Sequence, residues 1–141
     1  MSKILIIEDE PAIRRVLVKI LSEEDKSHEI DEAENGIDAI NQVKKNSYDL
    51  IISDIKMPKV DGMEVLDYSK KNTPETPIIM ISGHATVQIA VEAIRVGAYE
   101  FIEKPFSKEK ILNYVNRALE SSQLKKEKDL IENKLFHSFE L

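Results

Sequence analysis

The sequence of 141 residues contains no cysteine. The chain therefore has no disulfide framework, no thiolate ligand for a metal and no cysteine nucleophile. Long apolar segments are also missing, because the run near the N-terminus, Ile4 to Ile7, is too short for a signal peptide or a membrane span. These absences predict a cytoplasmic protein without a membrane contact.

A surplus of basic residues is missing as well. The chain has 26 Asp and Glu against 20 Lys and Arg, a formal net charge of −6. Because no basic stripe is present to meet phosphates, we expect no nucleic-acid contact by this segment. Hydrophobic residues make up 42% of the chain and charged residues 33%. This balance and the length predict one domain with its own core, followed by a tail.

Strand-like and helical patterns alternate five times along the chain. The predicted strands lie at 3–7, 28–33, 50–54, 78–81 and 99–103, and the predicted helices at 11–23, 36–45, 62–71, 86–96 and from 107 onward. Short continuous apolar runs are typical of strands buried on both faces of a parallel sheet. The alternation predicts an α/β fold, a doubly wound five-stranded parallel sheet flanked by five helices.

The fourth predicted helix has clear end signals. Thr86 is expected to cap its N-terminus, and Gly97 is expected to end it. Helical spacing also predicts which side chains of a helix face the core. For this helix the predicted inner residues are Val87, Ala90, Val91 and Ile94, and for the second helix they include Ile37 and Ile40.

The composition changes near residue 120. The stretch after it is charged and has no apolar face broad enough for a core, so we predict a domain at 1–120 and a linker helix at 121–141. Leu124, Ile131 and Leu135 place a thin apolar seam along that helix. Such a seam is too short for a stable coiled coil alone. A homodimer would therefore need the surface of the domain as well.

Polar residues follow four of the predicted strands at the point where each ends. Glu8 and Asp9 follow the first strand, Asp54 ends the third, Ser82 follows the fourth and Lys104 follows the fifth. The carboxyl ends of parallel strands open onto one edge of the sheet, so we expect these side chains to converge there. A lone Asp54 followed by a turn signal at Asp61-Gly62 would indicate only a capped loop, whereas the whole set indicates a site.

Three carboxylates brought together repel one another. At an effective dielectric of about 20, each pair about 4 Å apart costs on the order of 4 kcal/mol. Proton uptake or a hard divalent cation relieves this repulsion, and oxygen ligands without His or Cys favour Mg²⁺. Lys104 adds a positive charge and Ser82 a hydroxyl donor. Together these groups predict that Asp54 is a nucleophile that accepts a phosphoryl group.

Over roughly residues 1–120 the sequence resembles the receiver domain of bacterial two-component response regulators. IIEDEP is similar to the acidic pair of that family, SDIKMPKVDG to its phosphoacceptor loop, ISGHA to its hydroxyl residue and FIEKPF to its Lys-Pro loop. The resemblance implies a CheY-like strand order of 2-1-3-4-5 and a cis peptide bond between Lys104 and Pro105. It also implies a domain that catalyses only its own aspartyl phosphorylation and dephosphorylation.

The resemblance assigns a role to each residue of the site. Asp54 would be the phosphorylated residue, Ser82 and Lys104 would bind the phosphoryl oxygens, and Phe101 would stand at the aromatic switch position. The implied ligands of the Mg²⁺ cofactor are Glu8, Asp9, Asp54 and the backbone carbonyl of Lys56. Two residues depart from the family pattern, since Glu8 replaces the commoner Asp and Phe101 lacks the hydroxyl of the Tyr found in many relatives.

The segment SGHATVQIAVEAIRVGAYEFIEKPF is similar to receivers of the NtrC type, including the NtrX-like group. In those proteins an AAA+ ATPase and a DNA-binding domain follow the receiver. The resemblance therefore implies a sensor histidine kinase as phosphoryl donor, a homodimer, and regulation of a sigma-54-dependent transcription activator. The chain would then be the N-terminal part of a longer protein, and residues 121–141 would lead toward its ATPase.

Alternatives remain open on the same residues. A phosphohydrolase of the haloacid dehalogenase type also combines an Asp nucleophile, a hydroxyl, a Lys and Mg²⁺, but it needs an acid two residues after the nucleophile, where this chain has Lys56. A pseudo-receiver that only binds a partner does not need the intact acid set. His84 and the side chain of Lys56 fit either a role at the site or a solvated position.

Overall fold

A computed structural model describes residues 2–57 and 60–138, with side chains described as far as residue 132. In this part of the chain strands and helices alternate as predicted. The strands are Lys3–Ile7 (β1), Glu29–Ala33 (β2), Leu50–Asp54 (β3), Ile78–Ser82 (β4) and Glu100–Glu103 (β5). The helices are Pro11–Glu24 (α1), Gly36–Lys45 (α2), Gly62–Asn72 (α3), Val87–Val96 (α4) and Lys108–Ser138 (α5).

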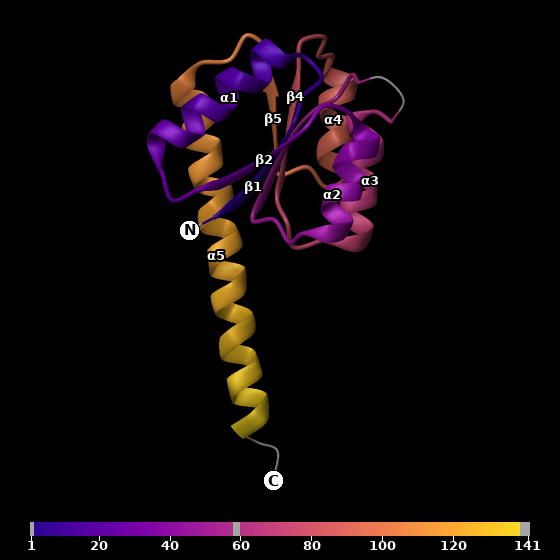
Figure 1. Cartoon of the computed structure of the whole chain (residues 1–141). Coiled ribbons are helices and arrows are strands. Elements are labelled where there is room, and N and C mark those ends of the chain that lie inside the picture. Colours follow the sequence, from indigo (N-terminus) through magenta and orange to yellow (C-terminus); the bar gives the residue numbers. More distant parts are fainter. Residues whose placement is uncertain (1, 58–59, 139–141) are drawn as a thin grey trace.

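The strands form one parallel sheet in the order β2-β1-β3-β4-β5, which confirms the predicted topology (Figure 1). Every side chain of β3 and β4 is buried, because helices cover both faces of the sheet. Asp54 lies opposite Ile81 in the register, and Ser82 lies opposite Glu103. This register brings the carboxyl ends of β3, β4 and β5 to the same edge.

Two hydrophobic clusters hold the helices against the sheet. On one face Leu17 of α1 lies in a cluster with Ile111 and Val115 of α5. On the other face Leu66 of α3 and Ala93 of α4 belong to a second cluster, to which α2 also contributes. The doubly wound arrangement can be followed in Figure 1, where α1 and α5 lie on one side of the sheet and α2, α3 and α4 on the other.

Specific residues fix the ends of α3 and α4. The side chain of Thr86 accepts a hydrogen bond from the amide of Ile89 at 3.1 Å, as predicted for an N-cap. Gly97 ends α4 with φ at 126°, a backbone conformation that favours glycine. Asp61 caps α3 by accepting from the amide of Glu64 at 3.0 Å, so α3 begins soon after the strand that carries Asp54.

The predicted inner face of α4 is wrong for Val87, Val91 and Ile94, whereas Ala90 is half-buried. Val87 is 80% exposed, and Val91 and Ile94 are each 49% exposed. The residues of α4 that pack inward are Ile89, Ala93 and Val96. Ile37 of α2 is also exposed rather than inward-facing. Helix α4 therefore presents a row of apolar side chains to solvent.

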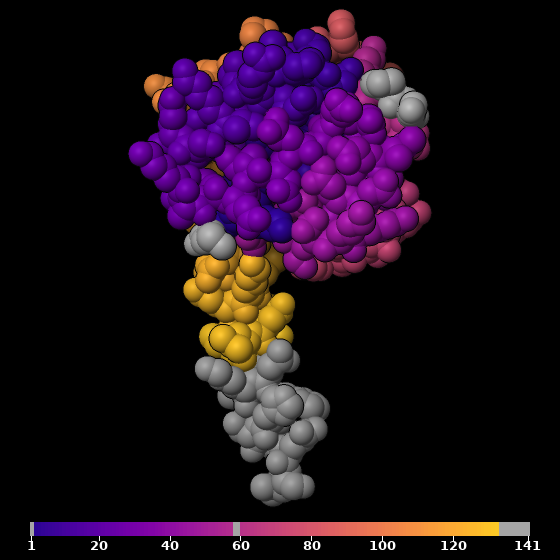
Figure 2. Space-filling model, viewed as in Figure 1, coloured from indigo at the N-terminus to yellow at the C-terminus, as the bar shows by residue number. Residues whose placement is uncertain are grey.

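Helix α5 continues beyond the body of the domain (Figures 1 and 2). Its contact with the body extends past residue 120, because Ser122 is buried and Lys126 forms an ion pair with Asp49. Leu124 and Ile131 of the predicted seam are exposed, and Leu135 lies outside the described side chains. Among the described residues no helix is long and apolar enough to cross a membrane.

Candidate functional site

Three carboxylates meet at the carboxyl edge of the sheet, as the sequence predicted. One oxygen from each of Glu8, Asp9 and Asp54 lies within 4.8 Å of the others. Glu8 and Asp54 are buried, whereas Asp9 is more exposed. Glu8 and Asp9 come from the loop between β1 and α1, and Asp54 is the last residue of β3. The topology of the sheet therefore brings Asp54 together with two acids that precede it by 46 and 45 residues in the sequence.

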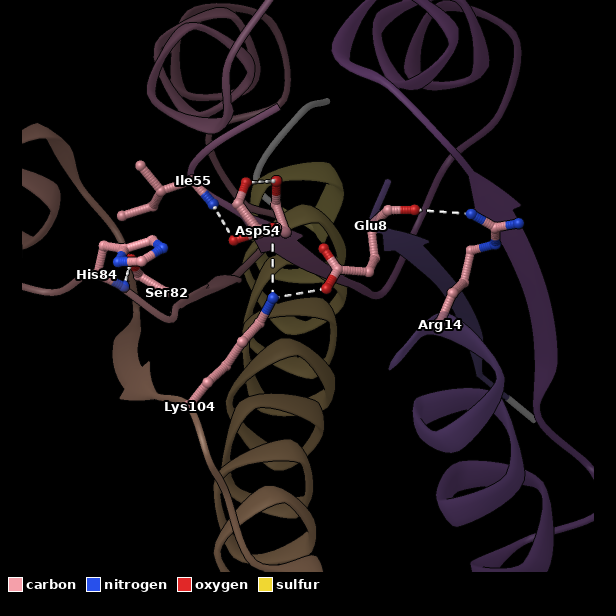
Figure 3. Close-up of polar contacts among 8 residues, drawn as sticks. Glu8, Arg14, Asp54, Ile55, Ser82, His84 and Lys104 are labelled. Carbon is pink, nitrogen blue, oxygen red and sulfur yellow. Dashed lines mark hydrogen bonds and ion pairs between the residues drawn. The ribbon is translucent and has the colours of Figure 1, made fainter. Parts of the chain in front are cut away.

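Lys104 joins two of these carboxylates. Its Nζ lies 2.6 Å from Oε1 of Glu8 and 3.3 Å from Oδ2 of Asp54 (Figure 3). The amide of Lys104 donates to the carbonyl of Ser82 at 2.9 Å, which anchors the residue to the end of β4. The Lys104–Pro105 peptide bond is cis, as the resemblance implied. The predicted convergence of the lysine on the acids is confirmed.

The electrostatics of the site favour a cation. Burial and the neighbouring Asp54 together raise the pKa of Glu8 to about 8, although Lys104 opposes the shift. Burial acts to lower the pKa of Lys104, but its contacts with Glu8 and Asp54 outweigh burial and raise it. Oε2 of Glu8 is buried and has no hydrogen-bond partner among the described residues. An unpaired oxygen among three carboxylates and one ammonium fits a hard divalent cation such as Mg²⁺.

The backbone around Asp54 orients its carboxylate. The amide of Ile55 donates to Oδ1 of Asp54 at 2.8 Å, which leaves Oδ2 toward Lys104. Gly62 packs beneath this turn, where its amide donates to the carbonyl of Ile55 at 2.7 Å. A Cβ at Gly62 would lie 2.1 Å from the carbonyl oxygen of Asp54, so only glycine fits. The sequence marked Gly62 as a turn, but its close approach to Asp54 was missed.

The remaining predicted residues surround this centre. Ser82 is buried at the end of β4, and its Oγ accepts from the amide of His84 at 3.2 Å. His84 is exposed and lies beside Ser82 in Figure 3. Phe101 is half-buried against the cluster on the α4 side of the sheet. Lys56 is exposed and lines an open groove together with Asp9.

The side chain of Arg14 contacts the site at the backbone of Glu8. This contact was not predicted from the sequence. Nη1 of Arg14 donates to the carbonyl oxygen of Glu8 at 2.7 Å (Figure 3). Its Nε donates to Oε1 of Glu32 at 3.0 Å. Arg14 lies on α1, where its charge fits the ordinary pattern of a solvated helix face. A contact with a loop carbonyl leaves no signal in helical spacing.

Comparisons with known proteins agree with this geometry. Residues 4–116 match the family described as the response regulator receiver domain. The chain is 40% identical over 126 residues to the nitrogen assimilation regulatory protein NtrX of Azorhizobium caulinodans, covering 88% of this chain and 27% of that protein. The chain thus spans 27% to 29% of the length of the first NtrX and NtrX-like relatives that it matches.

Solved receiver domains are similar in structure as well. The crystal structure of the receiver domain of NtrX from Brucella abortus has a TM-score of 0.77 and 41% identity, covering 83% of this chain and 98% of that one. The solution structure of the beryllofluoride-activated NtrC4 receiver domain dimer has a TM-score of 0.80 and 38% identity, covering 86% and 99%. These similarities bear out the resemblance to receivers of the NtrC and NtrX type.

Proposed function

Because the chain belongs to the response regulator receiver domain family, we propose that it is a phosphorylation-dependent switch that accepts a phosphoryl group on Asp54 from a sensor histidine kinase. One observation carries the proposal: the Asp54 carboxylate is held by the amide of Ile55 on one oxygen and faces Lys104 with the other. The domain would catalyse only its own phosphorylation and dephosphorylation. The haloacid dehalogenase alternative is dropped, since the family is that of receivers.

The transfer uses groups that the fold already holds in place. An oxygen of Asp54 attacks phosphorus, and a new O–P bond forms as the P–N bond to the phosphohistidine of the kinase breaks. The electron pair of the broken bond leaves with the imidazole. Lys104, at 3.3 Å from Oδ2 of Asp54, neutralises charge on the phosphoryl oxygens, and the hydroxyl of Ser82 donates to one of them.

We propose Mg²⁺ as the cofactor, with Glu8, Asp9, Asp54 and the backbone carbonyl of Lys56 as the residues that would hold it. A divalent cation bound there neutralises the carboxylates and the incoming phosphoryl group. Two features support this assignment: the ligand oxygens of the three acids lie within 4.8 Å of one another, and Oε2 of Glu8 lacks a partner among the described residues. Glu8 also keeps Lys104 beside the nucleophile through their 2.6 Å contact.

We propose that phosphorylation is read out on the face formed by α4, β5 and α5. Movement of Ser82 toward the new charge would vacate space, and the half-buried Phe101 would turn inward to fill it. Two discrete arrangements of this pair would let a small shift bias a whole surface. Near α4 and β5 this face exposes the apolar side chains of Val87, Val91 and Ile94 on α4 and of Tyr99 before β5.

The exposed face supports a homodimer as the output of the switch. A row of apolar side chains is more favourable when it is covered by a second copy than when it is left in water. The similar NtrC4 receiver domain forms a dimer when activated with beryllofluoride. In a longer chain, α5 would carry this change to AAA+ and DNA-binding domains of a sigma-54-dependent activator, as the similarity to NtrX suggests.

Phosphorylation of the purified 141-residue chain by acetyl phosphate and Mg²⁺ tests the central assignment. Intact mass should show one added phosphoryl group on the wild type and none on Asp54→Asn. Asp67→Asn is the matched control, because Asp67 is an exposed acid of α3 that pairs only with Lys71 in the described structure, and it should be phosphorylated like the wild type. Stoichiometric phosphorylation of Asp54→Asn would contradict the assignment, and no phosphorylation of the wild type would indicate a pseudo-receiver.

Sedimentation equilibrium with and without beryllofluoride tests the dimer. We expect beryllofluoride to shift the wild type toward a dimer and Val91→Ser to weaken that dimer, since Val91 is half exposed on α4. Truncation near Ser121 should weaken the dimer only in part. Monomers under every condition at tens of micromolar would refute the proposed homodimer while leaving the phosphorylation site intact.

A further inference from the structure

The loop that carries Glu8 and Asp9 is tied to the rest of the fold on both sides. The amide of Glu8 donates to the carbonyl of Ala33 on β2 at 3.0 Å. The carbonyl of Glu8 accepts from Nη1 of Arg14 on α1 at 2.7 Å (Figure 3). Both backbone groups of Glu8 therefore have a fixed partner, and one of these partners is a charged side chain.

Arg14 occupies a place that ordinarily disfavours a cation. Helix α1 begins at Pro11, so Arg14 ends its first turn, close to the positive end of the helix dipole. The structure compensates by giving the guanidinium two acceptors, the carbonyl of Glu8 and Oε1 of Glu32 at 3.0 Å. Its side chain is 18% exposed. The next residue, Arg15, is exposed and has no ion pair or side-chain hydrogen bond in the described part of the chain.

We propose that Arg14 is a positioning residue for the divalent cation of this site. Mutual repulsion among Glu8, Asp9 and Asp54 would push the loop between β1 and α1 away from β3. Arg14 opposes that movement, because it holds the carbonyl of Glu8 while Glu32 holds the guanidinium in place. Arg14 does not touch the cation and acts through the backbone of the loop. The inference rests on the proposed Mg²⁺ site.

Charge alone predicts the opposite effect. A guanidinium near a cation site repels the cation, so its removal by itself would strengthen cation binding. Loss of positioning weakens cation binding, because the carboxylates no longer start from the bound arrangement. The direction of the change in affinity therefore distinguishes a positioning role from a purely electrostatic one.

The test is Mg²⁺ binding to the full 141-residue chain by isothermal titration calorimetry, with Mn²⁺ electron paramagnetic resonance as a second readout. We expect Arg14→Gln to raise the Kd about tenfold, as loss of an outer-shell partner of a metal ligand commonly does. Arg14→Lys keeps the charge and one donor but loses the planar fork, so it should recover part of the affinity. Arg15→Gln is the matched control; it removes the same charge from the neighbouring residue and should leave the Kd within about twofold.

Thermal unfolding in EDTA will show whether each variant is folded before metal is added. If Arg14→Gln does not fold, Glu32→Gln provides an independent test, because it frees the guanidinium at an exposed position and should raise the Kd in the same direction by less. An unchanged or lower Kd in Arg14→Gln would overturn the inference. If that variant does not fold, an unchanged or lower Kd in Glu32→Gln would overturn it instead. Wild-type protein that binds no Mg²⁺, or an Asp9→Asn variant that binds it equally well, would overturn the metal site and this inference with it.

Discussion

Acidic side chains at the two edges of the sheet have pKa values that are shifted in opposite directions. At the amino edge Asp49 accepts the amide of Lys3 at 2.8 Å and pairs with Lys126 of α5. Burial acts to raise the pKa of Asp49, but these contacts outweigh burial and lower it. At the carboxyl edge burial and Asp54 raise the pKa of Glu8, and Lys104 offsets only part of that shift. An ionised acid thus stabilises the fold at one edge and destabilises it at the other.

This difference separates structural residues from functional ones. At the amino edge the acid of Asp49 and the hydroxyl of Thr76 have partners within the chain, and Oγ1 of Thr76 donates to the carbonyl of Tyr48 at 3.1 Å. The carboxyl edge leaves an oxygen of Glu8 without a partner in the described structure. In the proposed function, the partner that this oxygen lacks is a divalent cation that binds there, so some stability is given up for binding. Substitutions at the two edges should therefore have different effects.

The largest effect is expected at Gly62, which packs closely against the backbone of Asp54 at the carboxyl edge. A methyl group in Gly62→Ala would overlap the carbonyl of Asp54, so we expect a loss of about 3 kcal/mol in the free energy of unfolding and slower phosphorylation. Gly83→Ala is the control, since its Cβ would make an ordinary contact at 3.6 Å with Cδ of Lys104. Urea unfolding and acetyl phosphate labelling measure both quantities. Equal stability of the two variants would contradict the close packing beneath Asp54.

A smaller effect, confined to stability, is expected at the amino edge. Thr76 is buried, and Thr76→Val removes the donor to the carbonyl of Tyr48 while nearly preserving the volume. We expect a loss of about 1.5 kcal/mol in the free energy of unfolding. The rate of phosphorylation should not change, because Thr76 lies at the opposite edge from Asp54. A clear change in that rate would show that the two edges are coupled.

A pH dependence of stability is also expected at the carboxyl edge, and it arises from Glu8. Its pKa is about 8 in the folded protein and 4.5 as the reference for the unfolded chain. The folded state therefore holds the proton more tightly, and the resulting stability is complete below pH 4.5 and is lost as the pH rises toward 8. We expect the metal-free Tm to fall as the pH rises from about 5 to 8, because the folded protein loses the proton of Glu8 over that range.

The control for this pH dependence is Glu8→Gln, which cannot ionise. Its metal-free Tm should vary less over the same range, and the difference from the wild type isolates the contribution of Glu8. A wild-type Tm that rises relative to Glu8→Gln as the pH increases would show that Glu8 is stabilised in its ionised form.

Most of the fold could be predicted because its signals are local. Buried strands such as Ile78–Ser82 form continuous apolar runs, and Thr86 and Gly97 mark the ends of α4 by their own chemistry. The inner face of α4 could not be predicted, since Val87, Val91 and Ile94 have the same spacing as the inward-facing residues Ile89, Ala93 and Val96. Both rows of apolar residues are present in the sequence of the helix. Only packing against the sheet determines which row is buried.

The candidate site could likewise be predicted only in part. Glu8, Asp54, Ser82 and Lys104 were found because parallel strands bring their ends to one edge, which follows from the topology. The contacts of Ile55, Gly62 and Arg14 were not found, because each involves a backbone group whose position depends on the path of a loop. Side-chain chemistry could be read from the sequence, whereas the backbone that orients it required the structure.

The central claim is that the carboxyl edge is a cation site and the amino edge is not, and thermal unfolding with and without Mg²⁺ tests it most directly. At ten times the Kd, Mg²⁺ should stabilise the wild type by about 1.4 kcal/mol, a rise of roughly 5 °C in Tm. Asp9→Asn should lose this rise, whereas Asp49→Asn should have a lower Tm without metal and keep the rise. A rise that survives in Asp9→Asn, or disappears in Asp49→Asn, would contradict the account.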